Sequence, residues 1–268
     1  MLCQTLKEND FLSSPYATWP EVECLWSPPA SDIYIRCNEV HVWRIPLDLP
    51  ISQVNSFEQT LCFDELSKAN RYYSCVDRQR YKASRGSLRK ILSKYIGSEP
   101  SEIQFAYSSS GKPSLSSGLN SESLCFNMSH SNQYALCAIT LNRSIGIDVE
   151  YLRPAPDMLS IAKRYFASDE YETILSLSPD IREQAFYTLW TLKEAYLKAT
   201  GEGIRGLGNI EVKFSQIESI VSVIDNKNNL KEDCWTTHRF TPANNYAAGL
   251  TVKGKDDLVF KFYNIEQL

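Results

Sequence analysis

The stretch Phe186-Tyr-Thr-Leu-Trp-Thr-Leu-Lys-Glu-Ala-Tyr-Leu-Lys198 predicts a helix, because it contains neither Pro nor Gly and Gly201 follows as a stop signal. Residues four apart share one face of a helix, so Trp190, Glu194 and Lys198 form one row. Such a row offers an aromatic wall, a metal ligand or base, and a phosphate partner. An ordinary Glu–Lys surface pair, worth roughly 0.2–0.5 kcal/mol, is the other explanation.

A second stretch, Ile145-Gly-Ile-Asp-Val-Glu150, predicts a strand. Side chains alternate on a strand, so Gly146, Asp148 and Glu150 share the face opposite the three apolar residues. Two carboxylates on one face repel each other unless a cation lies between them. Hard oxygen ligands beside a glycine suit a magnesium ion that carries a phosphate. A solvent-facing edge strand with two acids is the alternative.

Taken together, the two stretches closely resemble the surfactin-type 4′-phosphopantetheinyl transferases of the holo-acyl-carrier-protein synthase superfamily. Gly111-Lys112-Pro113 and Phe126-Asn-Met-Ser-His-Ser131 match further motifs, in the order of that family. The resemblance covers roughly residues 40 to 265. It implies an enzyme that transfers the 4′-phosphopantetheine arm of coenzyme A to a serine hydroxyl of an apo acyl, peptidyl or polyketide carrier protein. The second product is 3′,5′-ADP.

The resemblance also implies roles for individual residues. Asp148, Glu150 and Glu194 are expected to bind magnesium. Glu194 is also a candidate general base, directly or through a water, and Lys198 is expected to neutralise the phosphates. The expected coenzyme A contacts are Lys112 near the adenine and phosphates, Ser129 and His130 on phosphate, Arg80 at the 3′-phosphate, and, by a looser alignment, Lys68 and Arg71. Taken alone, Gly-Lys-Pro is an ordinary surface turn and His130 an ordinary structural histidine.

The element pattern predicts an α+β fold. Strands are expected at 39–45, 103–107, 124–131, 134–141, 145–150, 210–214, 217–225, 235–240, 247–253 and 258–263. Helices are expected at 63–70, 77–95, 160–166, 168–177 (capped by Ser168) and 180–200. Mixed elements in this order suggest two halves. The resemblance implies that the halves are similar, are related by a pseudo-twofold axis, and hold the active site in the cleft between them.

The expected division is an extended leader at 1–32, an N-terminal half at 33–142 and a C-terminal half at 143–268. The N-terminal half contains a basic segment, residues 66–94, with nine Lys or Arg against one acid, Asp77. This segment carries +8, so the remainder of a chain with net charge −4 carries −12. We expect the segment to meet a small polyphosphate or an acidic protein, because an acidic remainder disfavours a nucleic acid partner.

Composition limits the other possibilities. With 268 residues and 43% hydrophobic side chains, the chain can bury a large core. It shows neither a long apolar run nor a signal peptide, so a cytoplasmic protein without membrane contacts is expected. Its length resembles that of the monomeric two-half members of the family, so a monomer is expected. The eight cysteines form no Cys-x-x-Cys pair, which argues against zinc and favours free thiols.

Two other function classes remain open at this point. A magnesium-dependent nuclease also uses paired acids and a lysine, but typically with the lysine two residues after an acid on a strand. Lys198 instead follows Glu194 by four residues on a predicted helix. A non-catalytic carrier-protein-binding module with the same fold is expected to lack one of the four charged residues proposed for catalysis, and all four are present.

Overall fold

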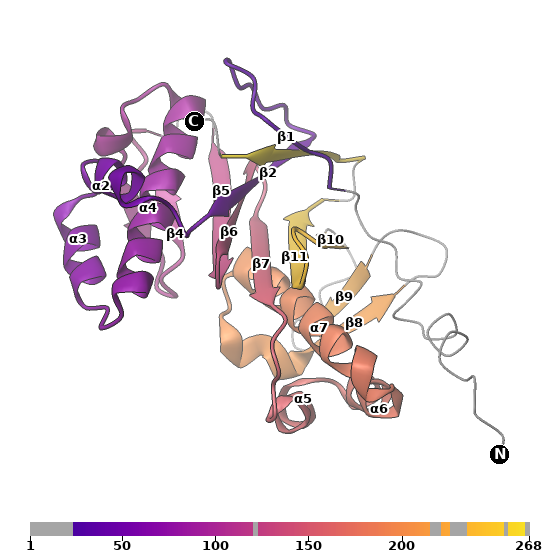
Figure 1. Cartoon of the computed structure of the whole chain (residues 1–268). Coiled ribbons are helices and arrows are strands. Elements are labelled where there is room, and N and C mark those ends of the chain that lie inside the picture. Colours follow the sequence, from indigo (N-terminus) through magenta and orange to yellow (C-terminus); the bar gives the residue numbers. More distant parts are fainter. Residues whose placement is uncertain (1–23, 120–122, 215–220, 226–234, 255–256, 266–268) are drawn as a thin grey trace.

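The computed structural model describes residues 24–119, 123–214, 221–225, 235–254 and 257–265. Between β1 (Trp26–Ser27) and β12 (Val259–Asn264), its elements fall into two runs of the same order (Figure 1). The first run is β2 (Glu39–Pro46), α2 (Ile51–Glu58), α3 (Phe63–Asn70), α4 (Cys75–Ile96), β3 (Phe105–Tyr107), β4 (Pro113–Leu115), β5 (Leu124–Ser131) and β6 (Tyr134–Leu141). The second is β7 (Ile145–Tyr151), α5 (Met158–Tyr165), α6 (Ser168–Ser176), α7 (Pro179–Thr200), β8 (Ile210–Phe214), β9 (Val221–Asp225), β10 (Trp235–Phe240) and β11 (Tyr246–Lys253).

The two runs match in detail. Each long helix, α4 or α7, has 22 residues and is followed by a 3₁₀ turn, Pro100–Glu102 or Ile204–Asn209. The first strand of each run pairs antiparallel with the last, β2 with β6 and β7 with β11. The expected α+β fold of two similar halves is therefore confirmed, although the repeat is not visible in the sequence.

Two five-stranded sheets hold these elements, in the orders β1-β12-β2-β6-β5 and β7-β11-β10-β9-β8. The short strands β3 and β4 form a separate hairpin. Strand β12 leaves the second half and pairs parallel with β2, and β1 pairs parallel with β12. The chain's last described strand thus completes the first sheet.

Alternating side chains place each sheet between two apolar layers. On β2, Trp43 and Ile45 pack in a core that includes residues of α4. Val40 and Val42 point the other way, into a core shared with β7 and β11 of the second sheet. The apolar residues of β7 lie in this shared core, as alternation predicts. The opposite face of β7, with its two carboxylates, is therefore directed to α7.

Both long helices have recognisable ends. Before α4, the Ser74 hydroxyl accepts a hydrogen bond from the Asp77 amide at 3.3 Å. Gly97 ends this helix with φ +66°. Helix α7 starts with Pro179 in its first turn and ends at Gly201, which has φ +83°. These left-handed conformations favour glycine, so both predicted stop signals are confirmed.

Most predicted elements are present with ends shifted by a residue or two, but some local predictions are wrong. Helix α2 and strand β4 were not predicted, because they are short and weakly patterned. The strand expected from Ile103 begins only at Phe105, after the 3₁₀ turn. Ser168 is the first residue of α6 and not its cap, since the Glu170 carboxylate accepts from the Ala167 amide at 2.7 Å. The predicted strand residues 217–220 lie outside the described residues.

The described end of the expected leader, residues 24–32, includes a short strand. Residues 1–23 lie outside the described part, but Trp26 belongs to β1 and stacks edge-on against Phe262 at 5.2 Å. Arg44 lies over the Trp26 ring at 4.6 Å. The leader's end is therefore part of the first sheet. The proposed boundary near residue 142 lies just before β7, where the second run starts. It stays a prediction, because β12 follows the second run but pairs with β2 of the first.

Among the described cysteines, Cys37, Cys62, Cys75, Cys125 and Cys137 are free thiols, as expected. The described residues include no helix long and apolar enough to cross a membrane.

Candidate active site

Helix α7 lies unusually close to β7, and Gly146 permits this. A Cβ built at Gly146 would lie 2.0 Å from the Ala195 carbonyl oxygen and 2.4 Å from the Ala199 amide nitrogen. The position next to the carboxylates is therefore filled by helix backbone. The expectation that this glycine leaves room for a metal is wrong; it brings the helix close to the strand that carries Asp148.

Lys198 pairs with Asp148 across this contact. Its ammonium lies 2.6 Å from Asp148 Oδ1 and donates to the Ser129 hydroxyl at 2.9 Å. The Ser129 hydroxyl in turn donates to Asp148 Oδ1 at 2.7 Å. Within the described residues, Lys198 makes no ion pair with Glu194. The ordinary explanation of a Glu–Lys surface pair is thereby contradicted.

Strand β5 meets the free edge of β7 through side chains on one face. The Asn127 Oδ1 atom accepts from the Ile147 amide at 2.9 Å. The Ser131 hydroxyl donates to Glu150 at 2.8 Å and accepts from the Tyr151 amide at 3.1 Å. No role was predicted for Asn127 or Ser131 from the motif Phe126–Ser131 alone. The alternation Asn127-x-Ser129-x-Ser131 was the signal that could have revealed them.

Glu194 and Glu150 are perturbed carboxylic acids. Burial, followed by repulsion from Asp148, raises the pKa of Glu194 to about 7, while Lys198 partly opposes this. The pKa of Glu150 is raised by the same two causes, burial first. Two buried oxygens, Asp148 Oδ2 and Glu194 Oε1, find no hydrogen-bond partner among the residues that the structure describes. The site therefore concentrates negative charge that the described side chains neutralise only in part.

This donor set suits a hard divalent cation by its chemistry. Carboxylate oxygens are the preferred protein ligands of magnesium, and the two unpartnered oxygens leave ligand positions available. The described side chains nevertheless bring no three His, Cys, Asp or Glu residues into an arrangement that could hold a metal.

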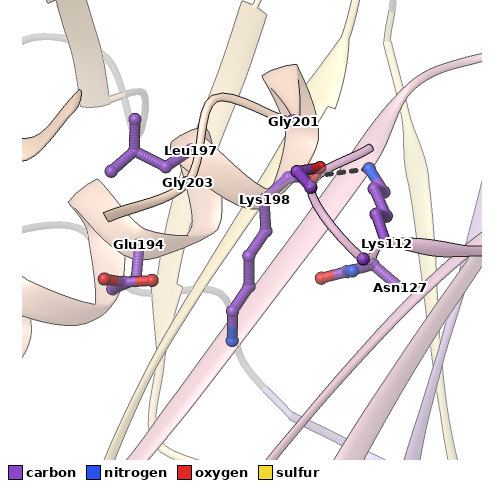
Figure 2. A pocket seen from close by; sticks show the side chains of 9 residues that line it. Lys112, Asn127, Glu194, Leu197, Lys198, Gly201 and Gly203 are labelled. Carbon is purple, nitrogen blue, oxygen red and sulfur yellow. Dashed lines mark hydrogen bonds between the residues drawn. The ribbon is translucent and has the colours of Figure 1, made fainter. Parts of the chain in front are cut away.

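A pocket of about 200 Å³ opens beside these residues, between the two halves (Figure 2). Glu194, Leu197 and Lys198 line it from α7, and Gly201 and Gly203 from the loop after the helix. Residues of the first half face them, namely Ser110, Gly111, Lys112 and Asn127. Trp190, expected as a wall, is not among the lining residues. It stacks on Phe186 at 5.9 Å within the helix packing.

The chain matches proteins of one family over nearly its whole length. Residues 144–251 match the family model described as 4′-phosphopantetheinyl transferase superfamily, and residues 51–142 match its N-terminal model. The 4′-phosphopantetheinyl transferase HetI of Nostoc is 43% identical over 229 residues, which cover 85% of this chain and 94% of HetI. The chain belongs to the 4′-phosphopantetheinyl transferase superfamily.

Two further relatives carry related names. The transferase Sfp of Bacillus subtilis is 31% identical over 61% of this chain and 71% of its own length. The L-aminoadipate-semialdehyde dehydrogenase-phosphopantetheinyl transferase of Xenopus laevis is 26% identical over 73% of this chain and 69% of its own. The surfactin-type resemblance is therefore confirmed. The chain is a 4′-phosphopantetheinyl transferase, an enzyme that moves the phosphopantetheine arm to carrier proteins, which favours neither the nuclease nor the non-catalytic alternative.

Acids elsewhere in the chain pair with four of the nine bases in the basic segment of the transferase. Arg80 forms a bidentate pair with Asp48, at 2.6 and 2.9 Å, and is not directed to a free anion site. The other internal pairs are Lys82 with Glu58 and both Arg85 and Arg89 with Glu65. The net +8 of residues 66–94 therefore overstates the available charge, because three acids outside the segment, Asp48, Glu58 and Glu65, pair with four of its bases.

His130, Lys68 and Arg71 remain as expected phosphate contacts. His130 lies at the exposed end of β5, and its pKa is lowered first by desolvation and then by the charges of Lys198 and Lys68. Lys68 lies over the Tyr81 ring at 5.6 Å, and Arg71 is exposed. Because the charge of Lys68 helps to lower the pKa of His130, the two side chains lie within electrostatic range of each other.

Lys112 and Ser129 do not have the surroundings that the resemblance implies. Ser129 is buried between Asp148 and Lys198, where it organises the ion pair. The Lys112 ammonium is directed to backbone carbonyls at the end of α7 and the start of β7. Neither side chain is directed to an open phosphate position.

Proposed function

We propose that this transferase binds coenzyme A along the cleft between its halves, with magnesium held by Asp148, Glu150 and Glu194. The observation that supports this most is the pair of carboxylate oxygens, Asp148 Oδ2 and Glu194 Oε1, that lack a partner among the described residues; they lie beside acids whose pKa values are raised by burial and then by repulsion from Asp148. A bound cation would remove that repulsion and neutralise the pyrophosphate of coenzyme A. The pocket is smaller than the roughly 300 Å³ of most ligand sites, so only part of coenzyme A would enter it.

The proposed reaction forms a bond between the carrier serine oxygen and the phosphorus that bears pantetheine. The bond from that phosphorus to 3′,5′-ADP breaks. The serine proton passes to Glu194, directly or through a water. Lys198 offsets charge on the leaving phosphates, and it must then share its ammonium between them and Asp148.

His130, Lys68 and Arg71 are proposed to contact the 3′-phosphate. His130 and Lys68 lie close enough to interact, and a basic surrounding favours an anion. Arg80 uses two of its five N–H donors on Asp48, so the others can still join this contact. Ser129 is proposed to act through Asp148 and Lys198.

The proposed partners are apo acyl or peptidyl carriers of fatty acid, polyketide or nonribosomal peptide biosynthesis. One copy of the chain is proposed to suffice, because both of its halves line the pocket. A nucleic acid partner is not proposed, since acids pair with four of the nine bases in the basic segment and the rest of the chain is acidic. Free thiols favour a reducing compartment such as the cytoplasm.

Mass spectrometry of apo carriers tests these proposals. The purified chain is incubated with coenzyme A and a panel of acyl, peptidyl and polyketide carriers, with magnesium or with excess chelator. The phosphopantetheine mass should appear on a carrier serine only with the metal. Full transfer in excess chelator would exclude the magnesium site, and transfer to none of the carriers would contradict the partner class.

A further inference from the structure

Lys112 is a charged side chain for which the transferase reaction has no evident use. It extends from the hairpin of β3 and β4 in the first half to the second half (Figure 2). Its ammonium donates to the carbonyl of Ile145 at 2.9 Å, of Lys198 at 2.5 Å and of Ala199 at 3.5 Å. An ammonium has three N–H donors, so these three acceptors leave none for a phosphate.

Two of these acceptors belong to the open end of α7. The last four carbonyls of a helix have no partner inside the helix. The Gly201 amide satisfies the Leu197 carbonyl at 2.8 Å, and Lys112 takes the next two. A cation at this end is also favoured by the helix dipole. Lys112 thus acts as a C-terminal cap supplied by a distant part of the chain.

The third acceptor connects this cap to the strand of the site. Ile145 begins β7, and Asp148 follows three residues later on the same strand. Lys198, whose carbonyl Lys112 holds, pairs through its ammonium with Asp148. Lys112 therefore contacts the backbone of both elements whose side chains form the central ion pair.

The base of the Lys112 side chain is also held firmly. The Ser108 amide donates to the Lys112 carbonyl at 3.0 Å, and the Lys112 amide donates to the Ser108 hydroxyl at 3.1 Å. Gly111 makes the turn between them with φ +81°. Burial lowers the Lys112 pKa, as expected for an ammonium that has carbonyls and no carboxylate around it.

We propose that Lys112 is a positioning residue, which fixes the end of α7 against β7 so that Lys198 and Glu194 face Asp148, and that it is not a phosphate ligand. The catalytic part of this inference rests on the proposed function above. The capping part does not, so the two can fail separately.

The test compares Lys112→Met, Lys112→Arg and the control Lys213→Met in the full chain. Lys213 is exposed on β8 and pairs with Glu211 at 3.4 Å, so its variant removes a lysine charge away from the cleft. Three quantities are measured: amide hydrogen exchange at residues 198–203, the dissociation constant of coenzyme A with magnesium by calorimetry, and the single-turnover transfer rate at saturating coenzyme A.

Lys112→Met should accelerate exchange at the end of α7 by roughly three- to thirtyfold, the loss typical of a helix cap. The transfer rate should fall by about ten- to a hundredfold, because small displacements of catalytic groups are costly. The dissociation constant should change less than about threefold. Lys112→Arg, which keeps the charge, should recover part of the exchange protection and of the rate together. Lys213→Met should match the wild type.

A phosphate ligand would behave differently: the dissociation constant of Lys112→Met would rise more than about tenfold while rate and exchange stayed unchanged. That result overturns the proposal. Faster exchange with an unchanged rate overturns the positioning role, and unchanged exchange overturns the cap. If Lys112→Met does not fold, Lys112→Arg is the test. Amide exchange and transfer rate that change together support the proposal, and a change in only one of them overturns it. If the wild type transfers to no carrier, the proposed function fails, and exchange still tests the cap.

Discussion

Replacing Glu194 by glutamine should make the metal-free protein more stable at alkaline pH. The Glu194 pKa rises from 4.5 to about 7 on folding, through burial and the nearby Asp148 charge. The folded protein therefore holds this proton more tightly than the unfolded chain does. The contribution of Glu194 to stability is therefore lost as the pH rises from about 4.5 to 7, and it changes no further above that.

The size of the effect follows from the same shift. Each pKa unit corresponds to about 1.4 kcal/mol, so the ionised carboxylate costs on the order of 3 kcal/mol at pH 8. Glu194→Gln removes the charge and keeps the shape. The variant should exceed the wild type by up to that amount at pH 8 in chelator, and by less than about 1 kcal/mol at pH 5. Added magnesium should stabilise the wild type more than the variant.

Urea unfolding from pH 5 to 8.5, with chelator or with magnesium, measures this difference. Glu183→Gln is the matched control, because Glu183 lies on the same helix with an unpartnered Oε1 atom but eleven residues before Glu194. This control variant should not show the gain in unfolding free energy at pH 8 that is expected for Glu194→Gln. The difference in unfolding free energy between Glu194→Gln and the wild type could be the same at pH 5 and at pH 8. That result would refute the clustering of carboxylates on which the metal proposal rests.

Four other changes test the site and the fold. Asp148→Ala should abolish transfer while circular dichroism stays native, since it removes a proposed metal ligand and the partner of Lys198; retained transfer would contradict this. Lys198→Ala should weaken both coenzyme A binding and turnover, with Lys198→Arg restoring binding more than turnover, as calorimetry and single-turnover rates will show. Coenzyme A should be preferred over its 3′-dephospho form by about ten- to a hundredfold, and His130→Ala should shrink that preference; equal use by the wild type argues against a 3′-phosphate grip. Lys193→Met should destabilise the protein by about 3–5 kcal/mol in urea unfolding, because it leaves the buried Glu170 carboxylate without its 2.6 Å partner, and adding Glu170→Gln should recover part of the loss.

Much of the site could be predicted from local patterns. The repeat of a helix places Glu194 and Lys198 on one face, and the repeat of a strand places Asp148 and Glu150 on another. Both periods are properties of the backbone, so they need no knowledge of the fold. Gly201 and Gly97 likewise mark helix ends by their own conformational freedom.

Partners of the charged groups could not be predicted in this way. Arg80 is paired with Asp48 and Lys198 with Asp148, at separations of 32 and 50 residues. Net charge counted along a segment misses such pairs, because an acid outside the segment can lie within 3 Å of a base inside it. Lys112 shows the same limit, since its acceptors are backbone carbonyls that carry no sequence signal.

The sequence by itself thus determined the family, the α+β class, the long helices and the faces on which the acids and the central lysine lie. Tertiary structure alone decided that α7 presses on β7 at Gly146, that β12 returns to the first sheet, and that Lys112 closes the end of the helix. The physical reason is the range of the interactions. Side-chain periodicity and turn conformation act between neighbours in the chain, whereas ion pairs and caps depend on distances through space that only packing sets.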